Sequence, residues 1–188
     1  GDRSFEQEYL ALYELEVEDL DALQAVSDEH MRRIEADEMH RSPPETIDRD
    51  NVRSMYFVET GPRLGGHDDV PETLFMPFTE PVSEEDDEEF NRWYQEVHLP
   101  EVLDVPGFSA ASRYKETGMN MTGRPWPINF PYLALYELGD GTKEAFENAM
   151  KELRRRISEG DRMEISDALG SDKITQVYSR ITDRIVAT

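Results

Sequence analysis

The sequence predicts an α+β protein with an internal duplication, and three observations support this prediction. First, the seven residues YLALYEL occur at 9–15 and again at 132–138. Second, the similarity continues beyond the heptamer, because Arg-Arg-Ile follows each copy, at 32–34 and at 155–157. Third, short alternating apolar segments and helical apolar stripes follow the order β-α-β-β-α-β over residues 72–188. That order is typical of a ferredoxin-like fold.

The first copy predicts only a β-α-β unit. Residues 9–17 carry alternating, largely apolar side chains and predict a strand. Residues 18–36 predict a helix, because apolar residues recur at helical spacing, acidic residues stand at its start and arginines near its end. A loop with two consecutive prolines follows, and residues 52–60 predict a second strand.

The second copy predicts all six elements. Pro77 lies inside the first of its strands and suggests an edge strand or a bulge, because proline cannot donate to a strand ladder. A capping-box-like Ser83 predicts the start of the first helix. Pro106 and Gly107 predict its end. The expected elements are a strand at 74–79, a helix from 83, strands at 108–115 and 132–138, a helix at 142–159 and a strand at 174–181.

The predicted domains are a partial ferredoxin-like repeat at 1–63, a linker at 64–71 and a complete ferredoxin-like repeat at 72–188. The first repeat lacks the counterpart of the first half of the second repeat. A half-sheet on its own would leave its hydrogen-bonding edges open. We therefore expect either that the missing β-α-β belongs to a longer tandem protein, or that another chain completes the sheet.

Composition limits the classes of partner. The formal net charge of −22 argues against nucleic acid and anionic membranes, which would repel the chain. The sequence has no cysteine, which excludes disulfides, thiolate metal sites and thiol nucleophiles. No apolar run approaches the roughly 20 residues of a spanning helix, and no signal peptide is recognisable. A cytoplasmic protein is expected.

One run of motifs resembles a known family. Residues 89–101 read EFNRWYQEVHLPE, residues 105–108 read VPGF, and Arg113-Tyr114 stand on the next expected strand before the YLALYEL strand. This pattern resembles the EthD-like branch of the dimeric α/β-barrel superfamily. The resemblance implies two ferredoxin-like sheets packed face to face as a barrel, within one chain or in a homo-oligomer. Related proteins include cofactor-free enzymes, haem-handling members and proteins of unknown role, so the fold alone does not fix the activity.

His98 is the candidate catalytic residue. An imidazole with its ordinary pKa of about 6.5 can accept and return a proton near neutrality. The alternative is a structural histidine that hydrogen-bonds the following loop. The apolar loop around Met119 and Trp126 is either a binding lid or a cover over the barrel mouth. The candidate substrate-binding residues are Asn91, Trp93, Tyr94, Arg113, Tyr114, Met119, Trp126 and Tyr136.

No metal site, cofactor or nucleotide site is predicted. The run at 67–69 (HDD) lies in a linker, His98 and Glu101 lack a third ligand, and no phosphate-binding motif is present. Two functions remain open. The first is a cofactor-independent enzyme that isomerises, cyclises, dehydrates or decarboxylates an apolar or aromatic small molecule by general acid/base chemistry. The second is a non-enzymatic protein that binds such a molecule; a haem-degrading oxygenase is a third possibility.

Overall fold

A computed structural model describes residues 8–38, 47–66, 71–120, 129–161 and 163–183. These residues form two compact units, each with its own internal contacts. The first unit takes its described residues from Val58–Lys115 and Phe130–Thr188. The second takes them from Phe5–Phe57 and Glu116–Asn129. The candidate site lies within the first unit.

The first unit is built on an antiparallel sheet with the strand order β1-β4-β5-β3-β6, to which β2 adds by pairing with β4. The central strand β5 pairs with β4 on one side and with β3 on the other. Leu64 and Gly65, inside the predicted linker, form β2. The strands are β1 Phe57–Glu59, β2 Leu64–Gly65, β3 Thr73–Thr79, β4 Phe108–Glu116, β5 Tyr132–Leu138 and β6 Ile174–Ser179.

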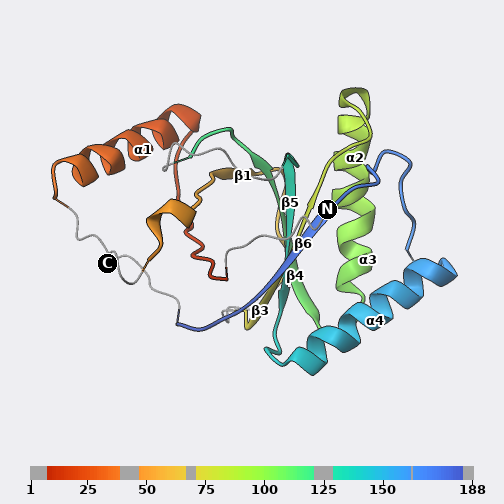
Figure 1. Cartoon of the computed structure of the whole chain (residues 1–188). Coiled ribbons are helices and arrows are strands. Elements are labelled where there is room, and N and C mark those ends of the chain that lie inside the picture. The colour runs from red at the N-terminus through yellow and green to blue at the C-terminus, as the bar shows by residue number, and fades with distance from the viewer. Residues whose placement is uncertain (1–7, 39–46, 67–70, 121–128, 162, 184–188) are drawn as a thin grey trace. The chain divides into compact units, whose positions relative to one another are not determined.

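Helices of the first unit cover one face of this sheet (Figure 1). Between β3 and β4 the chain forms α2 Asp87–Trp93, a π-helical turn Tyr94–His98 and α3 Leu99–Leu103. Between β5 and β6 it forms α4 Lys143–Glu159, whose start is capped by Thr142 through a hydrogen bond from the Ala145 N–H. The order from β3 to β6 is therefore β-α-β-β-α-β. This mixed α+β arrangement is consistent with the ferredoxin-like prediction.

Strand alternation decides which side chains meet the helices. Tyr132, Ala134 and Tyr136 of β5 belong to the core cluster shared with the helices, whereas Leu133 and Leu135 lie on the opposite face. Aromatic rings dominate the helix side: the Phe75–Tyr136 and Phe90–Tyr132 ring centroids are 5.9 and 5.2 Å apart. Such pairs add about 0.5–1.5 kcal/mol each beyond the apolar area they bury.

The edge-strand expectation for Pro77 is wrong. Strand β3 is an interior strand, with β5 on one side and β6 on the other. Pro77 pairs with Thr175 of β6, while the ladder to β5 has no pair at Met76 or Pro77. The missing N–H of Pro77 therefore coincides with a gap in one ladder, so an interior strand can hold a proline here.

In the second unit, the helix predicted at 18–36 is present as α1 Leu20–Glu35. Asp19 caps it by accepting a hydrogen bond of 2.8 Å from the Ala22 N–H. The expected strand at 52–60 is reduced to β1 at Phe57–Glu59, of which Val58 and Glu59 belong to the first unit. A 3₁₀ turn, Arg49–Asn51, precedes it.

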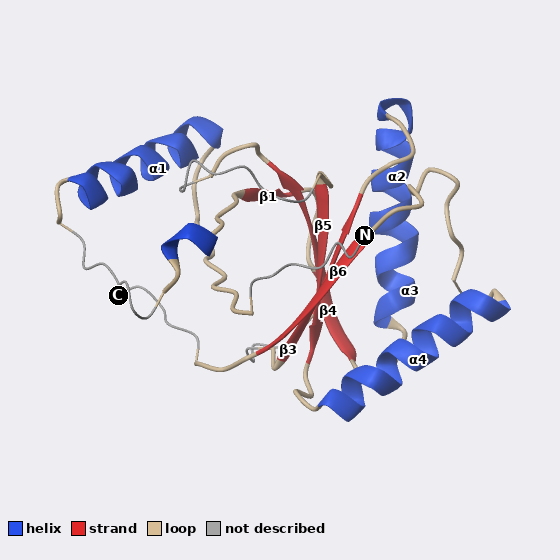
Figure 2. Cartoon of the chain, in the orientation of Figure 1, coloured by secondary structure: helices blue, strands red, loops and turns tan. Residues whose placement is uncertain are grey.

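The strand predicted at 9–17 is not formed. These residues have no regular secondary structure and are drawn as loop in Figure 2. Tyr9 and Tyr13 are each 76% exposed, whereas the identical heptamer in β5 is largely buried between two neighbouring strands. The difference has a physical cause, because strand preference reflects the packing of neighbours more than an intrinsic property of the backbone. Of the expected β-α-β unit of the first repeat, the described residues therefore form the helix and a shortened second strand but not the first strand.

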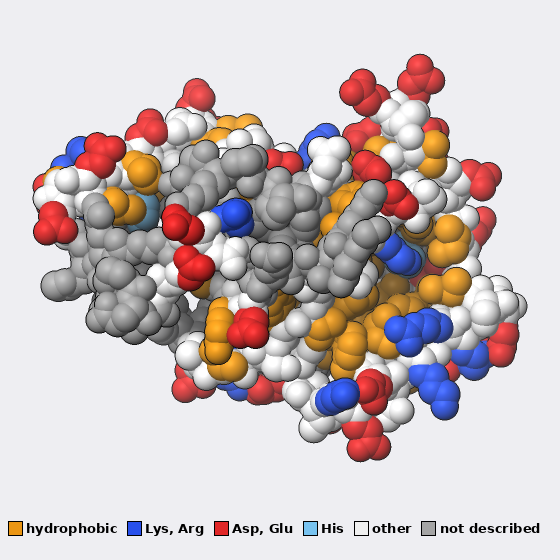
Figure 3. Space-filling model, in the orientation of Figure 1, with side chains coloured by type: hydrophobic (Ala, Val, Ile, Leu, Met, Phe, Trp, Pro, Cys, Tyr) orange, Lys and Arg blue, Asp and Glu red, His pale blue; other side chains and the backbone are white. Residues whose placement is uncertain are grey.

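The surface of the first unit is strongly acidic around the start of α2. Glu84, Glu85 and Asp86 form a 3₁₀ turn that leads into three further acidic residues. Acidic side chains accordingly cover much of the visible surface of this helix (Figure 3). Within the described residues, no helix combines the length and the apolar character needed to cross a bilayer.

Candidate functional site

The site is organised by the π-helical turn Tyr94–His98. Leu99 N–H donates to the Tyr94 carbonyl, five residues earlier, instead of following the α-helical pattern. Pro100 has no N–H, so it cannot make the next α-helical hydrogen bond at this point. Turns of this kind are frequent at functional sites because they change which residues face inward. Here Trp93, Tyr94 and His98 come together, with His98 stacked on Trp93 at 4.8 Å and edge-on to Tyr94 at 4.9 Å.

Arg113 of β4 lies at the centre of the site, and its side chain is only 1% exposed. Its guanidinium carbon is 4.0 Å from the centroid of the Tyr94 ring. The rings of Phe90 and Tyr132 lie at 4.9 and 5.1 Å. Aromatic faces attract a cation, by about 2 kcal/mol where it is desolvated, so these rings partly replace the water that Arg113 has lost.

Asn91 fixes the orientation of the guanidinium. Arg113 Nη1 donates to Asn91 Oδ1 at 2.9 Å. The Asn91 amide nitrogen donates to the Tyr132 hydroxyl at 2.9 Å and to the Asp87 carbonyl at 2.7 Å. Tyr132 in turn donates to the Asp87 carboxylate at 2.6 Å. Since both ends of the Asn91 amide are engaged, this network sets which edge of the guanidinium remains open.

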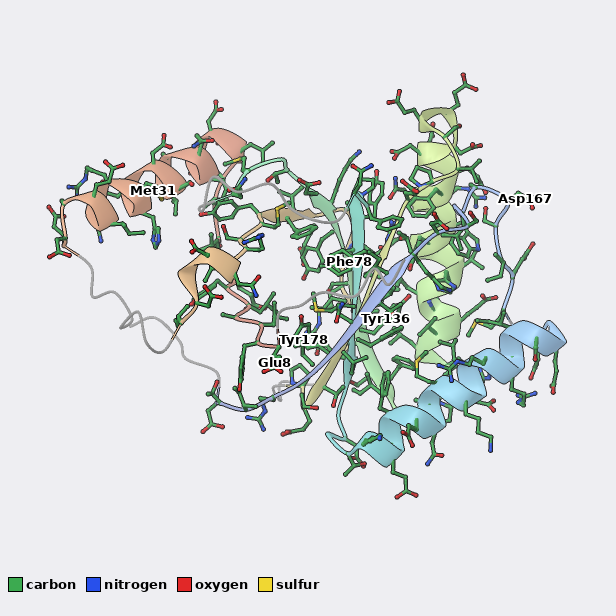
Figure 4. All side chains as sticks on the ribbon, in the orientation of Figure 1. Glu8, Met31, Phe78, Tyr136, Asp167 and Tyr178 are labelled. Carbon is green, nitrogen blue, oxygen red and sulfur yellow. The ribbon has the colours of Figure 1, made fainter. Side chains whose placement is uncertain are left out.

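Buried polar atoms without a hydrogen-bond partner in the described part of the chain are concentrated here. They include Arg113 Nε and Nη2, Thr79 Oγ1, Tyr136 Oη and His98 Nδ1. Figure 4 labels Tyr136 on β5, between the sheet and α3. Leaving a buried polar group unpaired destabilises a fold by about 1–3 kcal/mol, and more for a charged group. Such a cluster in one place indicates groups reserved for a ligand.

The two phenols of the site keep their protons at neutral pH, which makes the site rich in hydrogen-bond donors. Burial raises the pKa of Tyr94, an effect that the Arg113 charge and the nearby Tyr136 and Thr79 hydroxyls partly offset. Burial also raises the pKa of Tyr136 well above its usual value. Although the Tyr136 and Thr79 hydroxyls are close enough to influence Tyr94, neither makes a hydrogen bond of normal geometry, and we treat both as unpaired. Both phenols remain protonated at neutral pH.

His98 differs from the expectation of an imidazole that titrates near neutrality. Burial, with smaller effects from the charges of Arg113 and Lys173, lowers its pKa to about 4. The imidazole is therefore neutral at physiological pH, where it can accept a proton but does not act as a general acid. Its Nδ1 has no hydrogen-bond partner among the described residues.

The structure brings together most of the predicted site residues, namely Asn91, Trp93, Tyr94, His98, Arg113 and Tyr136. Trp93 is buried, and its indole N–H donates to the Glu164 carbonyl at 2.9 Å.

Three other candidates stand apart. Tyr114 follows Arg113 on β4 and so lies on the opposite face of the sheet. Met119 belongs to the second unit. Trp126 lies outside the described residues.

Sequence reasoning missed several contributors, which are Thr79, Asp87, Phe90 and Tyr132. Tyr132 could have been found, because it shares a strand face with Tyr136 at a spacing of four. Asp87 stands one helical turn before Asn91, so a contact between these two side chains could also have been predicted from the sequence. Within the described ranges, no three histidine or acidic side chains gather as a metal site.

Comparisons with known proteins add little. No family model matches the sequence, and no curated protein matches it. A solved structure of an anthrone oxidase-like protein is similar, with 16% identity over 68% of this chain and 55% of that chain, and a TM-score of 0.36. The chain thus spans about half the length of that protein. A likeness of this size carries no argument about fold or activity.

Proposed function

We propose that the first unit is a cofactor-independent enzyme that acts on an apolar or aromatic small molecule by general acid/base chemistry. The observation that carries the proposal is the group of unpaired polar atoms on Arg113, Tyr136, Thr79 and His98, enclosed by aromatic rings. Aromatic surroundings with a few convergent polar groups are typical of sites for small organic molecules.

The proposed role of each residue follows from the charge of its side chain. Neutral His98 accepts a proton from an acidic C–H or O–H of the substrate. Arg113 and the Tyr136 hydroxyl donate hydrogen bonds to the oxygen on which negative charge then develops. Donors already placed where charge develops are usually the largest contribution to catalysis, because they need no rearrangement during the reaction. Isomerisation, cyclisation, dehydration and decarboxylation can all proceed through such an oxyanion.

The second candidate function is binding without turnover. It is favoured by the lowered pKa of His98, since a base that holds a proton only below about pH 4 is weak at neutrality. In that case the same donors and rings would hold a small molecule, and His98 would serve as a hydrogen-bonding group.

Proton exchange on an enolisable aromatic ketone separates the two candidates. The protein is incubated with 2-tetralone in D₂O, and deuterium incorporation beside the carbonyl is followed by NMR. We expect wild-type protein to accelerate exchange, and His98→Gln to slow it by about a hundredfold or more, the usual contribution of a general base. His30→Gln, the same change at a histidine on α1 of the second unit and outside the site, is the matched control and should exchange at the wild-type rate.

Each outcome decides between the candidates. Binding of 2-tetralone without accelerated exchange, shown by shifted resonances of site residues, would favour the binding protein. If His98→Gln and wild type exchange at the same accelerated rate, His98 is not the base. If 2-tetralone neither binds nor exchanges, the proposed function fails for this class of molecule.

We further propose that the sheet face opposite α2, α3 and α4 packs against a second sheet, as in the barrel implied by the EthD-like resemblance. The apolar character of that face supports this proposal; Met76, Phe78 and Leu135 lie on it and are already buried within the single chain, so a second sheet would have to replace their present cover. The exposed heptamer at 9–15, which would become a strand once a second copy of the chain supplies its neighbours, also supports the proposal. Sedimentation velocity should then show an oligomer that Leu12→Lys disrupts and Glu16→Lys does not. A wild-type monomer at every concentration would overturn this part of the proposal.

A further inference from the structure

The two open donors of Arg113 belong to the same edge of its guanidinium. Nη1, on the other side, is engaged by Asn91, whereas Nε and Nη2 have no partner among the described residues. Nε–H and Nη2–H point in nearly parallel directions, with a spacing that matches the two oxygens of a carboxylate. The chain therefore buries a complete bidentate fork that no described residue of the protein engages.

The surroundings of the fork favour a planar ligand with two acceptor oxygens. The Tyr136 and Thr79 hydroxyls are further unpaired donors on the same face of the sheet. Within the described residues, neither the fork nor these hydroxyls is hydrogen-bonded to an acidic side chain. Asp87, the carboxylate whose charge acts on Arg113, is hydrogen-bonded by Asn91 and Tyr132 instead. A buried cation without a directly bonded carboxylate is costly to keep, so a carboxylate that arrives with the ligand would supply the missing partner.

We infer that the site takes a carboxylate-bearing aromatic small molecule, whose carboxylate is held by Nε and Nη2 of Arg113 while its ring lies against the surrounding aromatic side chains. This inference rests on the proposed function, because it names the substrate class of the same site. Arg113 binds the substrate directly, and Asn91 is a positioning residue that holds the guanidinium in the receiving orientation.

Carboxylate binding would also raise the pKa of His98. The charged groups that act on its imidazole are Arg113 and Lys173, and the titratable groups that act on Arg113 are Tyr94, Tyr136, Tyr132 and Asp87. Since the Arg113 charge is one cause of the lowered pKa of His98, an anion paired with Arg113 offsets that cause. The bound carboxylate would make His98 a stronger base, so substrate binding would itself favour the proton transfer.

The overall charge makes carboxylate preference a specific signal. With a formal net charge of −22, the chain as a whole repels anions, and the surface of α2 is visibly acidic (Figure 3). A tighter affinity for an acid than for its uncharged amide therefore cannot arise from the general electrostatic field. It requires a local cation with open donors.

The test compares 2-naphthoate with 2-naphthamide, which share a ring system and differ in charge. Dissociation constants are measured by calorimetry for wild type, Arg113→Lys and Arg92→Lys. We expect wild type to bind the acid at least about tenfold more tightly than the amide, the effect of hydrogen bonds to a charged group. Arg113→Lys keeps the charge but loses the fork and should lose most of this preference. The exposed control Arg92→Lys should keep it.

Two measurements on wild-type protein remain decisive even if Arg113→Lys does not fold. The Arg113 Nε–H proton resonance should move downfield with 2-naphthoate and not with 2-naphthamide. The His98 titration midpoint, followed by NMR, should rise only with the acid.

Equal affinity for acid and amide, or an unmoved Nε–H resonance, overturns the carboxylate inference and leaves the proposed function standing. If the protein deuterates 2-tetralone but binds neither naphthyl probe, the carboxylate inference is likewise overturned while the proposed function stands. A protein that neither binds these probes nor deuterates 2-tetralone refutes both.

Discussion

Replacing Arg113 with methionine should leave the free energy of unfolding nearly unchanged, although the side chain is only 1% exposed. The variant loses a charge-assisted hydrogen bond to Asn91, about 1.5–3 kcal/mol, and the ring contact with Tyr94, about 2 kcal/mol. It also leaves Asn91 Oδ1 unpaired, for about 1–3 kcal/mol. Against these losses it removes a buried ion with two unpaired donors, whose desolvation costs several kcal/mol. Losses and gains are therefore of similar size, several kcal/mol on each side, and largely cancel.

The companion variant Asn91→Ala should be much more harmful. It keeps the buried charge of Arg113 and removes the group that accepts its hydrogen bond, so we expect a loss of about 3 kcal/mol or more. Urea unfolding at pH 7, followed by tryptophan fluorescence and circular dichroism, gives both free energies from midpoint and slope. Arg92→Met, at an exposed arginine paired with Glu89, should leave the midpoint unchanged.

The reverse ranking would refute this reasoning. If Arg113→Met destabilised the protein by more than about 3 kcal/mol while Asn91→Ala was tolerated, the guanidinium would be a structural element of the core. Its open edge would then carry no functional meaning.

Further variants test the site and its scaffold. Because the folded protein holds the pKa of His98 near 4 while the unfolded chain titrates near 6.5, stability should fall as pH drops from about 6.5 to about 4, and His98→Gln should flatten urea midpoints across that window. Tyr132→Phe removes a buried hydroxyl that both donates and accepts, and should lower the free energy of unfolding by about 1–3 kcal/mol; an unchanged urea midpoint would contradict the network. Gly160 ends α4 with φ 65°, so Gly160→Ala should cost about 1 kcal/mol by thermal unfolding, whereas Gly139→Ala, where a Cβ would meet nothing within 4 Å, should be tolerated.

Local pattern was enough to predict most elements of the first unit, although β2 lies in the segment predicted as a linker. Alternation identified β4 and β5, and apolar residues at helical spacing identified α4. These signals are local, since they depend on residues within a turn or a strand. The same alternation places Tyr114 on the sheet face opposite Arg113, so the strand pattern alone separates it from the site.

Features that depend on distant partners could not be read in this way. The heptamer at 9–15 is identical to β5, yet only the copy with neighbours on both sides is a strand. The lowered pKa of His98 comes from burial and from Arg113, which stands on another element. The open edge of Arg113 depends on one side-chain rotation, set by Asn91 across the helix–sheet interface.

The geometry of the site depends on the number of residues in the π-helical turn Tyr94–His98 as well as on their identity. A helix advances by about 100° per residue, so a single extra residue rotates everything before it relative to everything after it. Deleting Gln95 would restore regular helical geometry and turn Trp93 and Tyr94 away from His98, although no residue of the site would have been altered. Loss of one codon at an apparently uninvolved position would thus dismantle the arrangement, whereas many substitutions at the same codon would spare it.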